Sequence, residues 1–350
     1  MRAMAVVPGR PDTAGVIDVA EPTVGDGPVL VATRMIGICG TDRDIVEGGH
    51  GSPPPGDDHL VLGHESLGEV LEAPADAGLA PGDLVVGIVR RPDPVPCRAC
   101  AAGEWDMCRN GRFVERGIKG RHGYGSERYR IHPEFAVRVD PALGMLGVLL
   151  EPTSVVAKAW EQIERIGSRA VFAPRVALVT GAGPIGLLAA LLARQRGLET
   201  HVVDLVTEGP KPDLVAALGA AYHSEPVGEI DVRPDVAVEC TGVGEVAVAV
   251  IRAAGPAGVV ALTGIRDGGT AQPTDLDAVN RELVLGNKAV FGTVNAARRH
   301  YEQAERALCR ADRSWLERLV SRRLPLDRWI DGLVPEDDDI KVVVEMPSSA

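Results

Sequence analysis

A cysteine, a threonine, a histidine and a glutamate stand in two short segments of the chain. Cys39 and Thr41 belong to the run Cys-Gly-Thr-Asp, and His64 is followed directly by Glu65. Thiolate, imidazole and carboxylate groups are all zinc ligands, and three protein ligands with one open position make a catalytic zinc site. Cys39, His64 and Glu65 are therefore candidate ligands. Taken singly, Cys39 also fits a small buried apolar position, and His64 a hydrogen-bonded core histidine.

A glycine-rich segment follows an apolar run in the middle of the chain. Residues 176–179 predict a buried parallel strand, and the pattern of residues 187–196 predicts a helix soon after it. Between them, three glycines suit a dinucleotide-binding loop: one for a tight turn, one for close approach of a pyrophosphate, and one for helix packing. The N–H groups at the helix start can bind phosphates. The candidate residues are Gly181, Gly183, Pro184, Ile185 and Gly186; a glycine-rich turn without a ligand is the alternative.

Polar residues follow three further strand candidates. Asp204 comes after residues 200–203, where a carboxylate can accept hydrogen bonds from the adenosine ribose and repel a 2′-phosphate. The next residue is Leu205 rather than an arginine, which favours NAD with NADP possible, although Asp204 could instead cap a turn. Thr241 and Thr263 are expected at the carboxyl edge of the same sheet, where the dinucleotide would lie, although either could belong to an ordinary turn.

The elements that position these residues form two patterns. Short apolar segments separated by Pro/Gly loops predict a twisted antiparallel sheet or partial barrel over the first 150 or so residues. Strand and helix candidates then alternate up to residue 294, which predicts an α/β fold with a doubly wound parallel sheet. The main strand candidates are 2–7, 29–32, 68–72, 84–89, 176–179, 200–203, 236–239, 259–262, 289–291 and 340–345. The helix candidates are 184–196, 211–218, 244–253, 275–285, 297–309 and 314–322.

Composition excludes several classes of partner. A net charge of −12 without a lysine-rich block argues against nucleic acid and anionic membranes. Aromatic residues make up only 3% of the chain, which argues against a surface that stacks bases. No segment has the length and apolar character of a membrane span or a signal peptide. We therefore expect a cytoplasmic protein with no membrane partner.

The order of the motifs resembles that of the zinc-dependent medium-chain dehydrogenase/reductase superfamily. Cys-Gly-Thr-Asp, Gly-His-Glu-x-x-Gly, Pro-Gly-Asp at 81–83 and Gly-x-Gly-x-x-Gly succeed one another, and the resemblance covers essentially the whole chain. Segments similar to the glucose dehydrogenase subfamily are 89–92, 115–118, 150–152, 209–212, 218–220 and 292–295. The resemblance implies a GroES-like partial β-barrel catalytic domain over 1–155, completed by 295–350. It also implies a Rossmann dinucleotide-binding domain over 156–294.

The resemblance further implies the catalytic metal ligands. Cys39 and His64 would ligate the zinc, and Glu65 or Glu151 would supply a carboxylate, directly or through water. Glu151 could instead be an acid at a helix N-terminus, which the helix dipole stabilises.

Substrate contacts follow from the same resemblance. Thr41 would touch the substrate oxygen and begin a proton relay, with Glu65 as a second catalytic residue. Glu115 and Asn295 would meet sugar or cofactor, and Glu151 would lie close to the substrate. The implied reaction is oxidation of an aldose such as D-glucose at C1 to the lactone, with hydride transfer to NAD(P)⁺. The alternatives are a polyol, secondary-alcohol or galactose-type dehydrogenase, or a non-catalytic nucleotide-binding or redox-sensing protein. A homodimer or homotetramer is expected.

A second zinc site is only partly present in the sequence. Cys97, Cys100 and Cys108 match three of the four thiols of the superfamily's structural zinc lobe, but the fourth position is Pro94. A closed four-coordinate site then needs Asp93 or an outside donor. Because an incomplete ligand set binds metal more weakly, both a bound and a lost structural zinc stay open.

Overall fold

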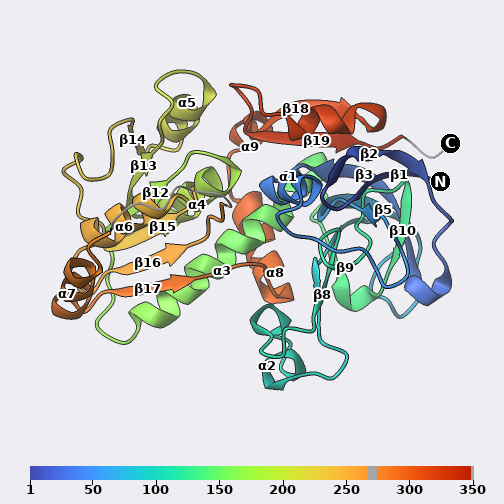
Figure 1. Cartoon of the computed structure of the whole chain (residues 1–350), viewed down its shortest axis with the longest axis horizontal. Coiled ribbons are helices and arrows are strands. Elements are labelled where there is room, and N and C mark those ends of the chain that lie inside the picture. Colours follow the sequence, from blue (N-terminus) through green and yellow to red (C-terminus); the bar gives the residue numbers. More distant parts are fainter. Residues whose placement is uncertain (267–273, 348–350) are drawn as a thin grey trace. The chain divides into compact units, whose positions relative to one another are not determined.

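The structure is a computed structural model that describes residues 1–266 and 274–347 (Figure 1). The chain divides into two compact units. Unit 1 comprises Met1–Ser154 and Asn295–Ala350, and unit 2 comprises Val155–Val294. Unit 1 is therefore assembled from two stretches of chain, whereas unit 2 is continuous. No helix within the described ranges is both long and apolar enough to cross a membrane.

Unit 2 holds, in its described residues, a six-stranded parallel sheet with the order β14-β13-β12-β15-β16-β17. Its strands are β12 (Val176–Thr180), β13 (Glu199–Val203), β14 (Ala221–His223), β15 (Val236–Glu239), β16 (Val259–Leu262) and β17 (Ala289–Gly292). Its helices are α4 (Pro184–Gln195), α5 (Pro210–Ala217), α6 (Gly244–Ala253) and α7 (Leu276–Gly286), and most of α3 (Leu150–Gly167) also belongs to it.

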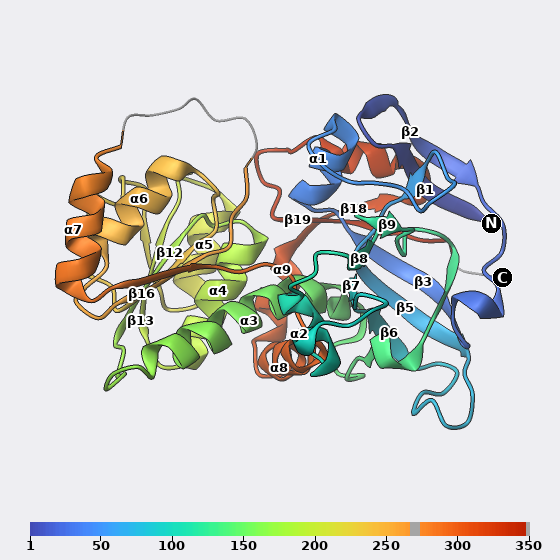
Figure 2. The same ribbon diagram turned by 60° about the horizontal axis from the view of Figure 1, so that its bottom comes forward.

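The strand order of unit 2 reverses direction between β12 and β15. α4 and α5 pack together, as do α6 and α7, and Figure 2 shows α6 and α7 across the strands from α3 and α4. Because helices cover both faces, the strands are continuous apolar runs, and Leu178, Ala237 and Val260 share one core cluster. In a doubly wound sheet, ligands bind outside the carboxyl ends of the strands at the point where the order reverses. That point here lies at the ends of β12 and β15.

Unit 1 is built mainly from antiparallel strands, which form three sheets in its described residues. The largest has the order β11-β6-β5-β3-β19-β18, with β10 also paired to β3, and the others are β2-β1-β4 and β7-β8-β9. The strands are β1 (Arg2–Val7), β2 (Arg10–Asp18), β3 (Val29–Gly37), β4 (Leu60–Val61), β5 (Glu65–Glu72), β6 (Leu84–Gly87), β7 (Arg90–Arg91), β8 (Val114–Arg116), β9 (Gly120–Arg121), β10 (Arg128–Ile131), β11 (Ala136–Arg138), β18 (Val320–Pro325) and β19 (Lys341–Glu345). The helices are α1 (Gly40–Glu47), α2 (Arg98–Ala101), α8 (Arg298–Cys309) and α9 (Arg313–Leu319).

Strand β3 lies between β5 and β19 in the largest sheet. Gly37, its last residue, is opposite Glu65 of β5 on one side and Val343 of β19 on the other. The chain that leaves β3 is therefore beside the chain that enters β5. This register brings together segments that are far apart in the sequence.

The C-terminal segment corrects one prediction. The helix expected over 314–322 ends at Leu319, and Val320 begins β18, which pairs in parallel with β19. Asp312 fixes the helix start, because its side chain accepts hydrogen bonds from the N–H groups of Ser314 and Trp315. The ladder of hydrogen bonds with β19 then replaces further helical turns.

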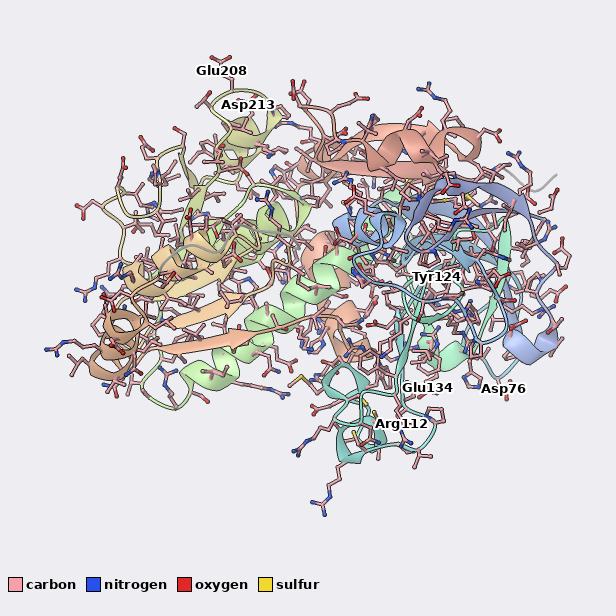
Figure 3. All side chains as sticks on the ribbon, viewed as in Figure 1. Asp76, Arg112, Tyr124, Glu134, Glu208 and Asp213 are labelled. Atoms are coloured by element: carbon pink, nitrogen blue, oxygen red, sulfur yellow. The ribbon has the colours of Figure 1, made fainter. Side chains whose placement is uncertain are left out.

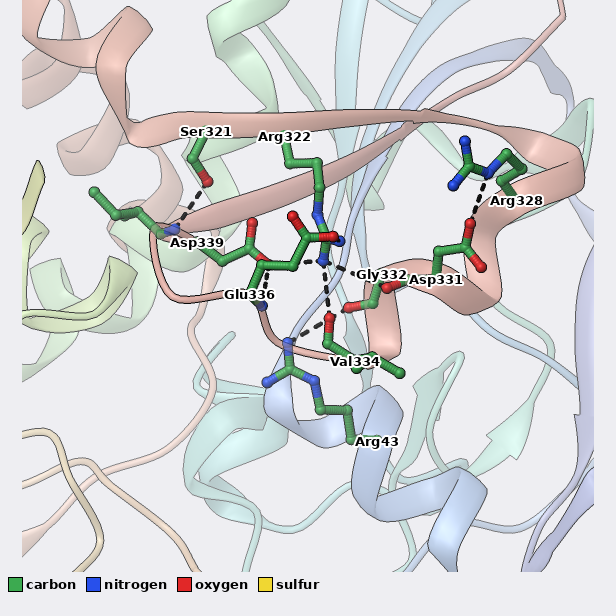
Figure 4. Close-up of polar contacts among 10 residues, drawn as sticks. Arg43, Ser321, Arg322, Arg328, Asp331, Gly332, Val334, Glu336 and Asp339 are labelled. Atoms are coloured by element: carbon green, nitrogen blue, oxygen red, sulfur yellow. Dashed lines mark hydrogen bonds and ion pairs between the residues drawn. The ribbon is translucent and has the colours of Figure 1, made fainter. Parts of the chain in front are cut away.

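Arg322 fastens the loop between β18 and β19 (Figure 4). Its guanidinium pairs with Asp339 at 2.6 Å and also with Glu336, and it donates to the Val334 carbonyl at 2.9 Å. The loop therefore reaches the start of β19 in a fixed position. Lys341 is the first residue of that strand.

Candidate functional site

Cys39, His64 and Glu65 meet at one end of the largest sheet of unit 1. One ligand atom of each lies within 4.8 Å of the others. Two ligands of a tetrahedral zinc ion lie roughly 3.5 Å apart, as its bond lengths of about 2.0–2.3 Å require. The donor types and their spacing therefore fit a zinc ion after a small adjustment. The register of β3 and β5 explains the meeting, because Cys39 follows β3 closely and His64 directly precedes β5.

Asp42, which was not predicted from the sequence, contacts two members of this cluster. Its Oδ2 accepts a hydrogen bond from Cys39 N at 2.9 Å, and its Oδ1 lies 3.5 Å from His64 Nδ1. Burial lowers the pKa of His64, but Asp42 and Cys39 together raise it well above its ordinary value. A carboxylate behind a histidine orients a metal-binding ring in this way. The sequence signal for Asp42 was its position three residues after Cys39, the N-cap residue of α1, where a capping side chain is expected.

The Glu65 carboxylate is paired with a second residue that the sequence analysis missed. Lys341 Nζ lies 2.8 Å from Glu65 Oε1 and 2.6 Å from Oε2, and both side chains are buried. Burial lowers the pKa of Lys341, but the charges of Glu65 and Cys39 raise it overall.

Two further candidates lie near the cluster without joining it. Glu151, in the first turn of α3, is buried, and burial and the charge of Glu65 raise its pKa to about 7. The hydroxyl of Thr41, on α1, lies 3.8 Å from Cys39 Sγ. Glu151 and Thr41 therefore lie close to the cluster of Cys39, His64 and Glu65, where a bound substrate could contact them.

Glu115 and Asn295 are brought together although 180 residues separate them. Asn295 Nδ2 donates to Glu115 Oε1 at 2.8 Å, and Arg90 Nε donates to the same oxygen at 3.0 Å. Asn295 adopts a left-handed backbone with φ of 62°, which costs a residue other than glycine some strain. One carboxylate oxygen of Glu115 is therefore held by two donors, one of which, Arg90, was not predicted.

The glycines at the start of α4 have three distinct geometries. Gly181 has a positive φ of 86°, and its N–H donates to the Val203 carbonyl at 2.7 Å. A Cβ on Gly186 would lie 1.7 Å from the Gly181 carbonyl oxygen, whereas one on Gly183 would meet nothing within 4 Å. The loop thus combines a tight turn, close packing and an open backbone, as a bound pyrophosphate requires.

The Asp204 carboxylate accepts hydrogen bonds from backbone groups of the protein and pairs with a lysine. Its Oδ2 accepts from Ala182 N at 2.6 Å and its Oδ1 from Val206 N at 3.1 Å. Lys211 of α5 lies 3.4 Å from the same carboxylate. Asp204 therefore ties the glycine loop to the end of β13, and any ribose contact would be made in addition to these bonds.

Glu239 organises the neighbouring strand ends and was not predicted. Its Oε1 accepts from Thr241 N at 2.6 Å, and its carbonyl accepts from Thr263 N at 2.8 Å. Thr241 and Thr263 thus lie beside the reversal point of the sheet, at the carboxyl edge expected for them.

The second group of thiols gathers around α2. Cys97, Cys100 and Cys108 place their sulfur atoms within 4.8 Å of one another. The Asp93 carboxylate is occupied elsewhere, since it accepts from Asn110 Nδ2 at 2.9 Å and pairs with Arg112 at 3.1 Å. Figure 3 shows Arg112 on this lobe. The hydrogen bond from Arg109 N is the largest of the effects that lower the pKa of Cys97 to about 6.

Comparison with known proteins decides the family. The model described as "Glucose dehydrogenase C-terminus" matches residues 144–346, and "Alcohol dehydrogenase GroES-like domain" matches residues 25–141. The chain belongs to the glucose dehydrogenase family. The predicted resemblance is confirmed, and so is the α/β fold with a GroES-like domain and a Rossmann-type sheet.

Individual members of the family cover the whole chain. The chain is 43% identical to a glucose 1-dehydrogenase of Methanocella arvoryzae over 99% of both proteins. It is 37% identical to a glucose 1-dehydrogenase of Thermoproteus tenax over 99% of both. Among solved structures, Haloferax mediterranei glucose dehydrogenase in complex with NADP, Zn and gluconolactone matches with a TM-score of 0.92 and 34% identity, covering 100% of both chains.

Proposed function

We propose that this protein is a zinc-dependent dehydrogenase that oxidises D-glucose or a similar aldose at C1 to the lactone, with NAD⁺ or NADP⁺ as acceptor. The observation that carries the proposal is the meeting of Cys39, His64 and Glu65 in one cluster. The similarity to the Haloferax glucose dehydrogenase in complex with NADP, Zn and gluconolactone supports it. Bound zinc would supply Lewis acidity at the hydroxyl that is oxidised, and bound nicotinamide would accept the hydride.

The chain's own residues hold the metal, orient the substrate and transfer the substrate proton. Cys39 and His64 hold the metal, with Glu65 or Glu151 as the source of a carboxylate. The Thr41 hydroxyl takes the substrate proton outward. Glu115 and Asn295 meet sugar or cofactor, and the donors Arg90 and Asn295 hold one oxygen of the Glu115 carboxylate in place.

In unit 2, the N–H groups of the loop Gly181–Gly186 bind the pyrophosphate. Pro184 and Ile185 form the first turn of α4, and Asp204, Thr241 and Thr263 face the dinucleotide. Assembly as a homodimer or homotetramer stays a prediction.

The test is turnover on a substrate panel together with metal analysis. We expect NAD(P)H and lactone to form from D-glucose, and chelation to abolish turnover until Zn²⁺ is restored. Good turnover of a polyol or simple secondary alcohol without any aldose activity would reject the sugar assignment. Full activity after complete removal of zinc would reject the metal assignment.

A further inference from the structure

Lys341 takes no part in the proposed chemistry, yet it binds the carboxylate of the metal cluster. Its ammonium donates to both Glu65 oxygens, at 2.8 and 2.6 Å, and to the Ile38 carbonyl at 3.1 Å. Lys341 is 2% exposed and Glu65 is 1% exposed, so water does not compete for this pair. The pair therefore draws the carboxylate toward β19.

The residues around the Glu65–Lys341 pair leave space for it and fix the strand that carries Lys341. A Cβ on Gly37 would lie 2.2 Å from Glu65 Oε2, so the carboxylate occupies space that only a glycine leaves open. Gly37 is also opposite Val343 of β19, which brings Lys341, two residues earlier, to the same end of β3. The contacts of Arg322 fix the loop that leads into this strand (Figure 4).

We propose that Lys341 is a positioning residue that keeps Glu65 away from a zinc ion held by Cys39, His64 and the Glu151 carboxylate, so that the fourth position stays open to substrate. This inference rests on the proposed function. An ammonium and a metal ion attract the same carboxylate, and Lys341 already occupies both of its oxygens. Without Lys341, Glu65 would be a buried and unpaired anion, which is costly, and the metal would be the cation available to it.

Metal binding to Lys341→Met, Lys341→Gln and wild type tests the proposal. Zinc affinity is measured by competition with a chromophoric chelator, and coordination by visible absorption of the Co²⁺-loaded protein. We expect Lys341→Met to bind zinc about tenfold more tightly, a change of the size that outer-shell partners produce. We expect its Co²⁺ absorption to change, because the Glu65 carboxylate would then occupy the position that is otherwise open. Lys341→Gln, which keeps a hydrogen-bond donor, should shift both readouts less, and this second variant carries the test if Lys341→Met fails to fold.

Two controls separate positioning from general damage. Lys288→Met removes the ammonium of a half-buried lysine in unit 2, which donates to the Ile251 and Arg252 carbonyls, and it should change neither readout. Adding Glu65→Gln to Lys341→Met should restore the wild-type Co²⁺ absorption, because the proposed effect acts through that carboxylate.

Three outcomes would overturn the proposal. They are unchanged readouts in the Lys341 variants, weaker zinc binding in them, or a Co²⁺ spectrum that Glu65→Gln fails to restore. A wild-type protein that binds no zinc at the cluster would instead contradict the proposed function itself.

Discussion

Asp42 shows how a residue without chemistry of its own can govern a site. Its two carboxylate oxygens face Cys39 N and His64 Nδ1, so one buried side chain sets the positions of two candidate ligands. Arg90 does the same for Glu115 by donating to one of its oxygens. The side chains that touch a ligand thus depend on a surrounding layer of partners, and rigid placement of this kind is what accurate chemistry requires.

Thr41 provides a test of the proton path. Thr41→Ala should lower kcat for glucose by about 10²–10⁴-fold, the usual contribution of positioned proton transfer. The hydroxyl lies 3.8 Å from Cys39 Sγ, so its loss should leave zinc content unchanged. Steady-state kinetics and metal analysis of the variant check both points, and Thr41→Ser should retain most activity. A Thr41→Ala enzyme with wild-type kcat would remove Thr41 from the mechanism.

The candidate ligands were readable from the sequence, but their partners were not. Cys39, His64 and Glu65 can be identified from their residue types and from the short motifs that contain them. Lys341 stands 276 residues from Glu65, in a run that otherwise reads as an ordinary apolar strand. No local pattern pairs the two, because their meeting depends on β3 lying between β5 and β19.

At the scale of elements, the turn after β13 offers a test of cofactor choice. Asp204→Ala should raise KM for NAD more than KM for NADP. NAD loses a partner for its ribose, whereas NADP also loses a repelling charge, and Lys211 becomes free to approach the 2′-phosphate. Initial rates with each cofactor measure the ratio. Asp213→Ala, on the exposed side of α5 (Figure 3), is the matched control, and an equal rise in both KM values would demote Asp204.

The pair of strands β13 and β14 carries a pH-sensitive contact. His201 Nδ1 and His223 Nε2 lie 2.9 Å apart, and burial together with His201 lowers the pKa of His223. The folded state therefore favours the neutral ring, whereas the unfolded ring takes up a proton near its ordinary pKa of about 6.5. The unfolded state then binds more protons as pH falls, so the free energy of unfolding should drop between about pH 7 and 5.

Replacing His223 should flatten this dependence. Urea unfolding of wild type and His223→Gln at several pH values gives the two slopes, and His50→Gln, at an exposed histidine, serves as the control. Equal slopes for wild type and His223→Gln would show that His223 does not contribute to the pH dependence of stability.

Periodicity predicted the elements of unit 2 better than those of unit 1. The helix expected over 244–253 is α6 (Gly244–Ala253), since its apolar spacing and neighbouring glycines are local signals. The predicted end of the helix at residue 322 was wrong, because Val320 pairs with Lys341 of β19, 21 residues further along the chain. Local pattern determines an element only where no distant strand competes for the same backbone groups.

For the whole molecule, zinc content distinguishes the two thiol-containing sites. We expect about one zinc ion per chain after dialysis, because three thiolates without a fourth ligand form an incomplete structural site. The Asp93 carboxylate, the predicted fourth donor, is taken up by Asn110 and Arg112. Metal analysis and thiol titration check this, with Cys97 expected to react at neutral pH. Two zinc ions per chain and protected lobe thiols would mean that another donor completes the lobe.

Unit 1 is formed from two stretches of chain that flank unit 2. Unit 1 therefore begins first in the chain but is completed after unit 2. Met1–Ser154 is synthesised first, yet β3 lacks its neighbour β19 until residues 341–345 have been made, whereas the continuous unit 2 is complete earlier. Until β19 has been made, one edge of β3 lacks its strand partner. Lys341 can pair with Glu65 only once β19 is present, so a chain that stops before this strand would leave the carboxylate of the candidate metal cluster without its ammonium partner.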